Sequence, residues 1–240
     1  MVNKHQRISR EAVAEKIECY ILANHLTAHQ KLPSERKMSE MWKVNRTTLR
    51  TALNQLIAEG VLYKDSDKII CISPPKFMQN LQYATGFTEA ARLSGRNPSV
   101  RVISVEVCEA TKKVAQELKL LLGHKTMELV RVMMLDGTPV QIDTAYLDAE
   151  RFAEIEKQDY SKMSLYEVLE GKYGVSVTHG SENLSITYID SQEAALLEIP
   201  ENTPVIYQKG VVIDQNDVPV EYFKSVIRSE YVRFVSKLVR

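Results

Sequence analysis

The sequence lacks several features that would indicate a special compartment or a covalent framework. Its 240 residues carry 31 Lys and Arg against 31 Asp and Glu, so the whole chain has no net charge. Its only cysteines, Cys19, Cys71 and Cys108, are far apart, which predicts neither a disulfide framework nor a cysteine zinc site. No apolar run approaches the 18 residues of a membrane span, and the first residues contain no apolar segment typical of a signal peptide. We therefore expect a cytoplasmic protein with reduced thiols and no membrane partner.

Motifs of common enzyme classes are also absent. The chain contains no G-x-S-x-G, no H-E-x-x-H and no glycine-rich phosphate loop. Its five histidines are scattered, and only His25 and His29 have a spacing compatible with a metal site, for which a surface pair is the interpretation we favour. The sequence thus predicts no catalytic residues, no metal site and no cofactor.

Charge is distributed unevenly, although its sum is zero. Residues 1–70 contain 12 basic and eight acidic side chains, whereas residues 71–240 contain 19 basic and 23 acidic ones. A head with a net charge of +4 therefore precedes a body of −4. Such asymmetry indicates a nucleic-acid-facing or membrane-facing module attached to a second part.

The head has the pattern of three helices and a hairpin. A helix follows Ser9, a second begins after the N-cap Ser34 and runs to about Trp42, and a third begins after Asn45 and ends at Gly60. Two short strands follow, over residues 61–64 and 68–72. This order, with only three residues between the second and third helices, predicts a winged helix-turn-helix.

Side chains at the start of the third helix suit DNA. Arg46, Thr47, Thr48 and Arg50 occupy its first turn and a half, the part of a recognition helix that usually contacts base edges. Arginines there oppose the helix dipole, which favours a phosphate partner over a purely structural role. The alternative is a solvated polar face.

These residues resemble the GntR family of bacterial transcription regulators over residues 9–72. The resemblance rests on four motifs: Leu32-Pro-Ser-Glu-Arg36, Asn45-Arg-Thr-Thr-Leu-Arg50, Ala52-Leu53, and Glu59-Gly-Val-Leu-Tyr63. It implies operator contacts from these residues: Arg36, Asn45, Arg46, Thr47, Thr48 and Arg50.

The wing departs from the family pattern. Members usually carry a glycine at the wing tip, whereas this chain has Asp65-Ser66-Asp67-Lys68. Because carboxylates near phosphate are repulsive, Lys68 is the best remaining candidate for a wing contact.

Ser73-Pro74-Pro75-Lys76 forms a stiff polar break. We therefore predict a DNA-binding domain over residues 1–73, a linker over 74–80 and a second domain over 81–240. The second domain alternates strand and helix patterns, so the predicted fold class is α+β with an antiparallel sheet.

Several local signals define the elements of the second domain. Residues 111–122 predict an amphipathic helix, and Asp136-Gly137 predicts a type I′ hairpin. Capping boxes begin at Ser164 and Asp190. Residues 231–238 predict a final strand.

The body resembles the UTRA ligand-sensing domain of the HutC subfamily, whose fold is similar to chorismate lyase. The resemblance covers most of residues 80–238. Its carriers are Gly86-Phe-Thr-Glu89, Val130-Arg-Val132, Ile142-Asp-Thr-Ala-Tyr-Leu147, Ser164-Leu-Tyr166, Thr203-Pro-Val205 and Asp217-Val-Pro-Val-Glu-Tyr222. It implies that a small effector binds at matching positions, which include Phe87 and Thr88.

Charged residues within apolar strands support a binding pocket. A buried Arg131 needs a partner, which is either an internal carboxylate, Asp143 or Glu221, or an anionic ligand. Asp143 and Glu221 could equally accept hydrogen bonds from ligand hydroxyls or an amine. The capped helix start at Ser164, Leu165 and Tyr166 offers backbone N–H groups to an anion.

The resemblance also narrows the effector. Sensors of sugar phosphates in this group tend to have Arg-x-Arg on this strand and some place a tyrosine near the phosphate, whereas this chain has Met133 and Ile227. We expect an effector less charged than a sugar phosphate, or one held differently: a sugar, a sugar derivative or a small carboxylate.

The leading hypothesis is a homodimeric regulator, a repressor that binds a palindromic DNA operator and is released by a small metabolite. Alternatives are an architectural DNA-binding protein with a degenerate sensor, or a lyase-like enzyme.

Overall fold

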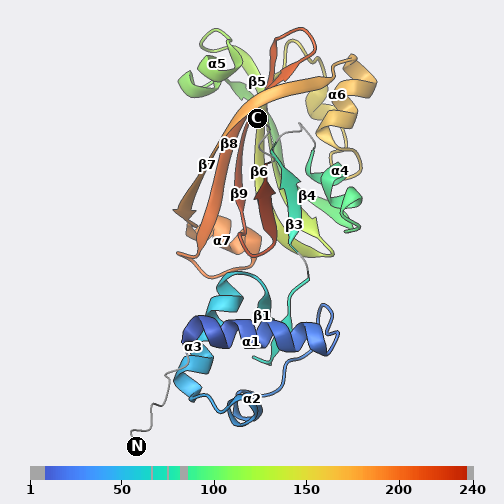
Figure 1. Ribbon diagram of the computed structural model, residues 1–240. Helices are drawn as coiled ribbons and strands as arrows, with labels where there is room; N and C mark the ends of the chain where they lie inside the picture. Colours follow the sequence, from blue (N-terminus) through green and yellow to red (C-terminus); the bar gives the residue numbers. More distant parts are fainter. Residues whose placement is uncertain (1–8, 66, 75, 82–85, 237–240) are drawn as a thin grey trace, which may run out of the picture. The chain divides into compact units, whose positions relative to one another are not determined.

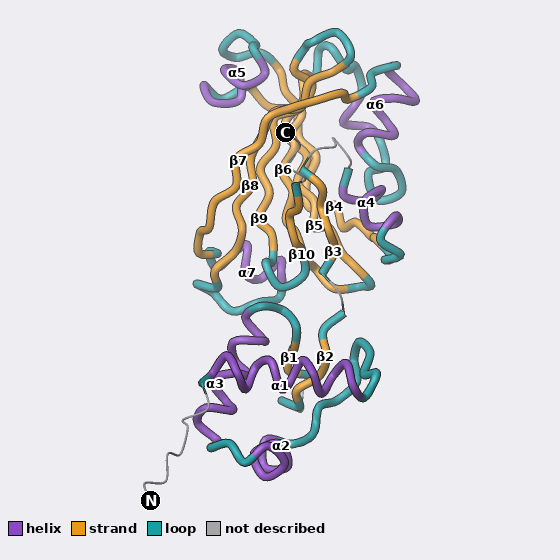
Figure 2. Tube along the Cα trace, in the orientation of Figure 1, coloured by secondary structure: helices purple, strands orange, loops and turns teal. Residues whose placement is uncertain are grey.

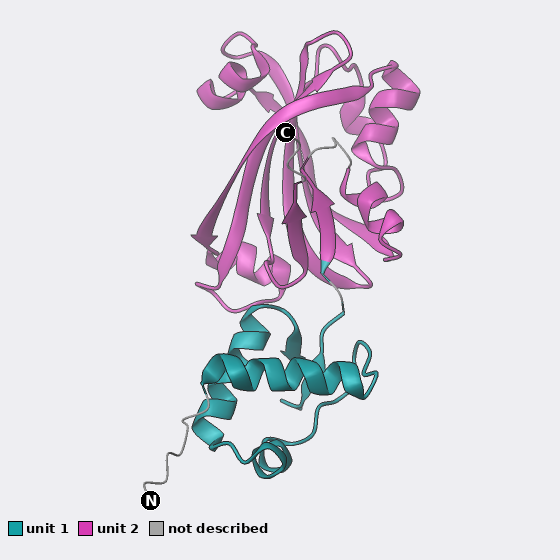
Figure 3. Ribbon diagram, viewed as in Figure 1, with its two compact units in different colours: residues 1–76 teal, residues 77–240 magenta. Residues whose placement is uncertain are grey.

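A computed structural model describes residues 9–65, 67–74, 76–81 and 86–236, in two compact units. The units comprise residues 1–76 and 77–240 (Figure 3).

The first unit contains three helices and a two-stranded hairpin. Its elements are α1 (Arg10–Ala23), α2 (Glu35–Trp42), α3 (Arg46–Ala58), β1 (Leu62–Lys64) and β2 (Ile70–Ile72). The strands are antiparallel. This is the predicted winged helix-turn-helix.

Short polar side chains begin these helices, as the sequence predicts. Ser34 Oγ accepts a hydrogen bond from Lys37 N at 3.4 Å, and Asn45 Oδ1 accepts one from Thr48 N at 2.7 Å. Gly60 follows α3 with φ of 72°, the left-handed conformation that glycine adopts without strain. The caps therefore confirm where α2 and α3 begin and where α3 ends.

One apolar core holds the first unit together. α1 contributes Val13 and Ile17, while α3 contributes Leu49, Leu53 and Leu56, all at most 1% exposed. These residues recur every three or four positions, so each helix buries one stripe. The opposite face of α3 is left at the surface.

A six-stranded antiparallel sheet forms the centre of the second unit (Figure 1). In spatial order its strands are β4 (Pro98–Glu109), β5 (Lys125–Leu135), β6 (Thr138–Asp148), β9 (Pro219–Ile227), β8 (Pro204–Asp214) and β7 (Val177–Tyr188). Asp136 and Gly137 both have positive φ between β5 and β6, which confirms the predicted tight hairpin.

Helices cover parts of this sheet. They are α4 (Phe87–Leu93), α5 (Lys112–Leu118), the short helix η1 (Ile155–Lys157), α6 (Leu165–Tyr173) and α7 (Ser191–Leu197). Both predicted capping boxes are present, at Ser164 with Glu167 and at Asp190 with Glu193. In Figure 1, α4 and α6 lie on one side of the unit, and β7 and β8 arch towards α6.

The predicted linker differs from the structure in its last four residues. β3 (Phe77–Asn80) pairs in parallel with β10 (Val232–Val235), and Figure 2 shows the two strands beside each other. Phe77 is 1% exposed in the core of the second unit. The predicted final strand, residues 231–238, is accordingly shorter, and its last two residues lie outside the described ranges.

The predicted helix over residues 111–122 also ends early. Lys119 adopts φ of 55°, and the chain turns so that Leu120 N donates to Ala115 O at 2.8 Å. Leu120 then packs on the cluster under α5, while Leu121 and Leu122 are 81% and 75% exposed. The apolar pattern therefore continues past the end of the helix.

Candidate functional site

The start of α3 presents polar side chains at the surface of the first unit. Arg46 and Thr47 are exposed and Thr48 is half-buried. Asn45 is also exposed, but its amide oxygen already accepts from Thr48 N. Its side chain therefore caps the helix, and only the amide N–H groups remain to donate to another molecule.

Arg50 is anchored by the preceding helix. Its Nε donates to Glu35 Oε2 at 2.6 Å, and its side chain is 67% exposed. Arg36 lies 3.9 Å from Glu40 in a more exposed pair. The pair with Glu35 restrains Arg50 at the α2–α3 corner while its terminal nitrogens stay at the surface. Exposed pairs of this kind contribute little to stability, so DNA can replace them at small cost.

The wing tip achieves its turn without glycine. Asp65 Oδ1 accepts hydrogen bonds from Asp67 N at 3.0 Å and from Ile69 N at 2.8 Å. Lys68 takes the left-handed conformation, with φ of 61°. Ser66 lies outside the described residues. Asp65 therefore holds the turn, and Lys68 and Asp67 are exposed at the tip.

In the second unit, one cavity of about 730 Å³ contains every residue predicted for effector binding. They come from five elements and one helix cap: Phe87 and Thr88 of α4, Arg131 of β5, Asp143 of β6, the cap Ser164 with Leu165 and Tyr166 of α6, and Glu221 of β9. Residues more than 130 positions apart in the chain thus meet at one site. Their role in binding remains a prediction.

A buried hydrogen-bonded chain crosses the floor of the cavity. Arg131 Nη2 donates to Asp143 Oδ2 at 2.5 Å, so the internal carboxylate is the partner that Arg131 has in this structure. Asp143 Oδ1 accepts from Ser225 Oγ at 2.8 Å, and Ser225 accepts from Gln141 Nε2 at 3.3 Å. Sequence reasoning missed Gln141 and Ser225, which are neutral and follow no recognisable motif.

Glu221 lies on the same floor and is 3% exposed. Its Oε2 accepts a hydrogen bond from the Tyr166 hydroxyl at 2.8 Å. Burial, reinforced by the nearby charge of Asp143, raises the pKa of Glu221 to about 7, although Arg131 and the Tyr166 hydrogen bond act in the opposite direction. The floor therefore resists a further negative charge.

The start of α6 is less suited to an anion than the sequence predicts. Ser164 Oγ accepts from Glu167 N at 3.1 Å, and Glu167 Oε2 accepts from Ser164 N at 2.8 Å. The hydrogen bond from the Ser164 backbone is the largest factor that lowers the pKa of Glu167. The helix start thus already carries its own carboxylate, which repels an anion.

Acidic side chains dominate the described lining of the cavity. Besides Asp143 and Glu221, they are Glu89, Glu167, Glu170 and Glu182, against the two arginines Arg92 and Arg131 and the imidazole of His179. Glu182 accepts a hydrogen bond from Gln208 across the β7–β8 pair. In sequence, these acids resemble ordinary solvated helix and strand residues, so no signal distinguishes them.

Met133 and Ile227, at which this chain departs from sensors of sugar phosphates, lie in different parts of the second unit. Met133 lines the cavity and is 4% exposed. Ile227 is fully buried in the cluster with Phe77 and Val232, away from the described lining. Neither supplies a positive charge.

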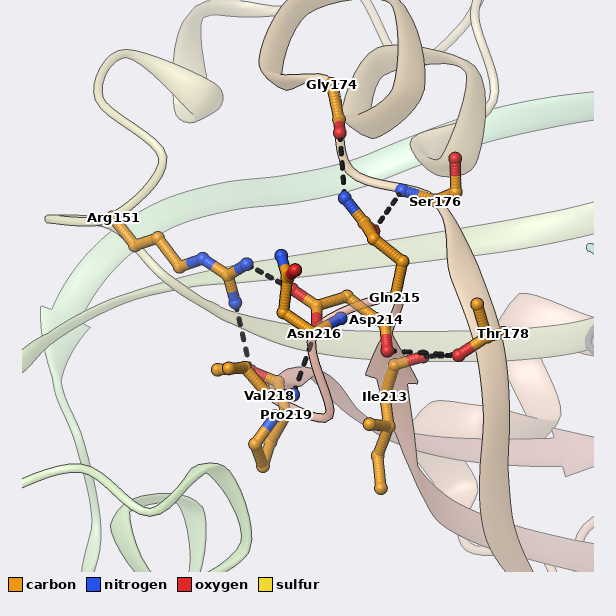
Figure 4. Close-up of polar contacts among 10 residues, drawn as sticks. All are labelled: Arg151, Gly174, Ser176, Thr178, Ile213, Asp214, Gln215, Asn216, Val218 and Pro219. Atoms are coloured by element: carbon orange, nitrogen blue, oxygen red, sulfur yellow. Dashed lines mark hydrogen bonds and ion pairs between the residues drawn. The ribbon is translucent and has the colours of Figure 1, made fainter.

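A second polar network lies at the β8–β9 turn (Figure 4). Asp214, which is fully buried, accepts hydrogen bonds from Arg151, from Asn216 N at 2.8 Å and from Val218 N at 2.9 Å. Thr178 Oγ1 donates to Asp214 O at 3.0 Å and so joins the first part of β7 to the turn. The network fixes one wall of the cavity, because Thr178 lines it.

Neither a membrane-spanning helix nor a metal centre is found among residues 9–65, 67–74, 76–81 and 86–236. No helix within these ranges has both the length and the apolar character needed to cross a membrane. No group of three or more His, Cys, Asp or Glu side chains in the described part of the chain is arranged to hold a metal ion.

Comparison with known proteins identifies both units. The UTRA domain family matches residues 93–233, and the family of bacterial regulatory proteins, gntR family, matches residues 9–66. The transcriptional repressor NagR of Bacillus subtilis is 28% identical over 230 residues, which are 95% of this chain and 93% of NagR. The repressor PhnF of Mycolicibacterium smegmatis is 28% identical over 204 residues, 85% of this chain and 82% of PhnF.

A solved structure agrees with these matches. The crystal structure of PhnF from Mycobacterium smegmatis is similar with a TM-score of 0.69 at 26% identity, over 95% of this chain and 99% of that one. The families and relatives are transcription regulators, not enzymes. With its helix-turn-helix head and its cavity-bearing body, the chain belongs to the UTRA-domain proteins and is a DNA-binding transcription regulator of the gntR family.

Proposed function

We propose that this protein is a repressor that leaves its operator when a small metabolite occupies the cavity of the second unit. The observation that carries this proposal is the cavity itself, because it gathers all eight residues for which sequence reasoning predicts effector contact. Relatives that cover most of the chain are repressors, which supports the direction of regulation. Operator DNA lies in the bacterial cytoplasm, and we place the protein there.

The head binds DNA through the exposed starts of α2 and α3. Arg46 and Thr47 contact base edges or phosphates, and Arg36 and Arg50 contact the backbone or guanines beside them. Thr48 and Asn45 support them from the first turn, and Lys68 is the wing contact. Because Asp67 is exposed beside Lys68, the wing contributes less than α3.

The functional form is a homodimer on a palindromic operator. The edge strand β7 supports this proposal, since Leu184, Ile186 and Tyr188 are 40%, 79% and 69% exposed on one of its faces. An unpaired edge with apolar side chains favours pairing with a second copy. Antiparallel pairing of two identical strands satisfies two-fold symmetry.

The effector belongs to the class of sugars and sugar derivatives. A floor of carboxylates, an arginine and an amide offers partners to several hydroxyl groups. A small carboxylate, which the sequence also allows, is disfavoured by the acidic lining and by the carboxylate that caps α6.

A DNA-binding experiment tests this function. The full-length protein is used to select its operator from fragments of the host genome, and its affinity for this operator is measured. The mass of the protein in solution is measured separately to test for a dimer. Arg46→Ala should weaken specific binding by about 1–3 kcal/mol, because an arginine–guanine pair has about that value. Lys16→Ala, an exposed change on α1, is the matched control. Equal affinity for the operator and for unrelated DNA would contradict the proposal.

The architectural alternative is separated by the response to ligand. A regulator dissociates from the operator when an effector binds, whereas an architectural protein keeps its DNA affinity. Titration of the protein–operator complex with the sugars and amino sugars described below distinguishes the two.

A further inference from the structure

The acidic lining of the cavity exceeds its positive charge. Arg131 is already paired with Asp143, and Arg92 lies 3.5 Å from Glu167. The remaining lining carboxyls, Glu89, Glu170, Glu182 and Glu221, form no ion pair within the described part of the chain. They project from α4, α6, β7 and β9, so they surround the space from several sides.

Two buried polar groups on the floor have unused hydrogen-bonding capacity. Gln141 is 5% exposed, and its Oε1 accepts no hydrogen bond from the described residues. The orientation of this amide follows from its neighbours, because Ser225 donates its proton to Asp143 and can only accept from Gln141. Glu221 uses Oε2 for Tyr166, and its Oε1 has no described donor. These oxygens therefore lack hydrogen-bond donors, whereas Arg131 Nε on the same floor lacks an acceptor among the described residues.

An anionic ligand fits this lining poorly. It could accept from Arg131 Nε, but it supplies no donor to the oxygens of Gln141 and Glu221, and it adds negative charge to a lining already rich in carboxylates. Hydroxyl groups are compatible, since each can donate to a carboxylate and also accept from an arginine such as Arg131, whose Nε lacks a partner in the described structure.

Resting on the proposed function, we infer that the effector carries an ammonium group, together with hydroxyls, and that this group binds at the Glu221 end of the cavity. An ammonium group has three donors and a full positive charge, so it supplies what the floor lacks. The hydroxyls bind towards Asp143, Ser225 and Gln141. An amino sugar or a related polyhydroxylated amine has this chemistry.

Binding of an ammonium group should change the protonation of Glu221. A cation beside Glu221 holds its carboxyl ionised, so binding below about pH 7 releases a proton. The charged and titratable groups that face Glu221 are Asp143 on β6, Arg131 on β5 and Tyr166 on α6. Asp143 and Arg131 are already paired with each other, which leaves Glu221 as the group that changes its protonation.

Matched ligands test the inference on the full-length protein without DNA. The probes are D-glucosamine, D-glucose, D-glucuronate and D-glucose 6-phosphate, which differ mainly in charge. D-glucosamine should bind about tenfold more tightly than D-glucose, because a charge-assisted hydrogen bond replaces a neutral one. The thermal midpoint of the protein should rise by a few degrees with D-glucosamine. The affinity for D-glucosamine should increase as the pH rises from about 5 to about 7, where Glu221 ionises and the amine of the ligand keeps its proton.

Variants locate the ammonium site. Glu221→Gln should remove the preference for D-glucosamine and its pH dependence, whereas Glu201→Gln, an exposed change outside the described lining, should keep both. Glu170→Gln on the exposed face of α6 provides a second test if Glu221→Gln does not fold. D-glucosamine binding no better than D-glucose, or stronger binding of either anion, would overturn the inference.

Failure of the inference and failure of the proposed function are distinguishable. Ligand binding is measured without DNA, so loss of operator recognition leaves this result unchanged. A protein that binds D-glucosamine but stays on its operator would retain the ammonium site and lose the proposed mode of regulation.

Discussion

Asp214 and Glu221 belong to the same β8–β9 hairpin, and both are buried carboxyl groups with different surroundings. Asp214 in the turn receives hydrogen bonds from Arg151 and two backbone N–H groups. Burial opposes its ionisation, but these donors outweigh burial and lower its pKa. Glu221 on the cavity floor receives one hydrogen bond, and burial raises its pKa to about 7.

The difference separates a structural network from a site prepared for a ligand. In the turn, every oxygen of the Asp214 carboxylate has a donor within the protein, so the group is complete without another molecule. On the floor, Gln141 Oε1 and Arg131 Nε are buried without partners among the described residues. Unsatisfied buried polar groups are costly, and a bound ligand is the natural compensation.

Removal of the Asp214 carboxylate should have the largest effect. Asp214→Ala leaves Arg151 and the two N–H groups without their acceptor, and it should destabilise the second unit by about 3 kcal/mol. Chemical denaturation monitored by circular dichroism measures the change, with Glu201→Ala as a control at an exposed turn. A loss below about 1 kcal/mol would show that the turn is not the structural network described here.

Replacement of Glu221 should stabilise the second unit, and only at a pH above about 4.5. The folded pKa of Glu221, about 7, lies above the usual glutamate value of 4.5, so between these values the folded state retains a proton that the unfolded state loses. Stability therefore decreases as pH rises from about 4.5 to 7. Glu221→Gln removes this penalty, and at pH 8 it should be more stable than the wild type by roughly 3 kcal/mol.

Glu221 and Asp214 should also differ in how the free energy of unfolding that each contributes depends on pH. At about pH 4, Glu221→Gln and the wild type should have nearly equal free energies of unfolding. The contribution of Asp214, whose pKa is lowered, is present above its unfolded value near 3.8 and is lost as the pH falls further. A pH-independent difference between Glu221→Gln and the wild type would refute the assigned protonation of Glu221.

Local chemistry predicted much of this fold. Ser34, Asn45, Ser164 and Asp190 were identifiable as caps because a short acceptor side chain stands just before each helix. The parallel β3–β10 pair was not predictable, since Phe77 meets Val232 across most of the second unit, and a strand pattern over residues 231–238 does not indicate which segment the strand pairs with. Distant pairing depends on the whole fold, not on nearby residues.

The cavity was predictable only in part. Arg131, Asp143 and Glu221 stand out as charges within apolar strands, and the structure brings them together. Gln141 and Ser225 do not stand out, because neutral polar residues are common in strands.

The geometry of the wing was not predictable either. Lys68 adopts the left-handed conformation that a glycine usually provides, and Asp65 supports the turn. The absence of a glycine from the wing sequence did not indicate this geometry.

The smallest expected effects compare one hydroxyl from each network. Ser225→Ala leaves Asp143 and the amide of Gln141 without a shared partner in a buried position, and it should cost about 2 kcal/mol. Thr178→Val removes a hydroxyl at a solvent-exposed position that contacts backbone carbonyls and His179 Nδ1, and it should cost about 0.5 kcal/mol. Saturating D-glucosamine should stabilise the Ser225→Ala protein less than the wild type, because Ser225 belongs to the floor that the ligand completes. Equal costs of the two variants in the absence of ligand would mean that the turn and the floor are the same kind of network, and the distinction between Asp214 and Glu221 would then rest on charge alone.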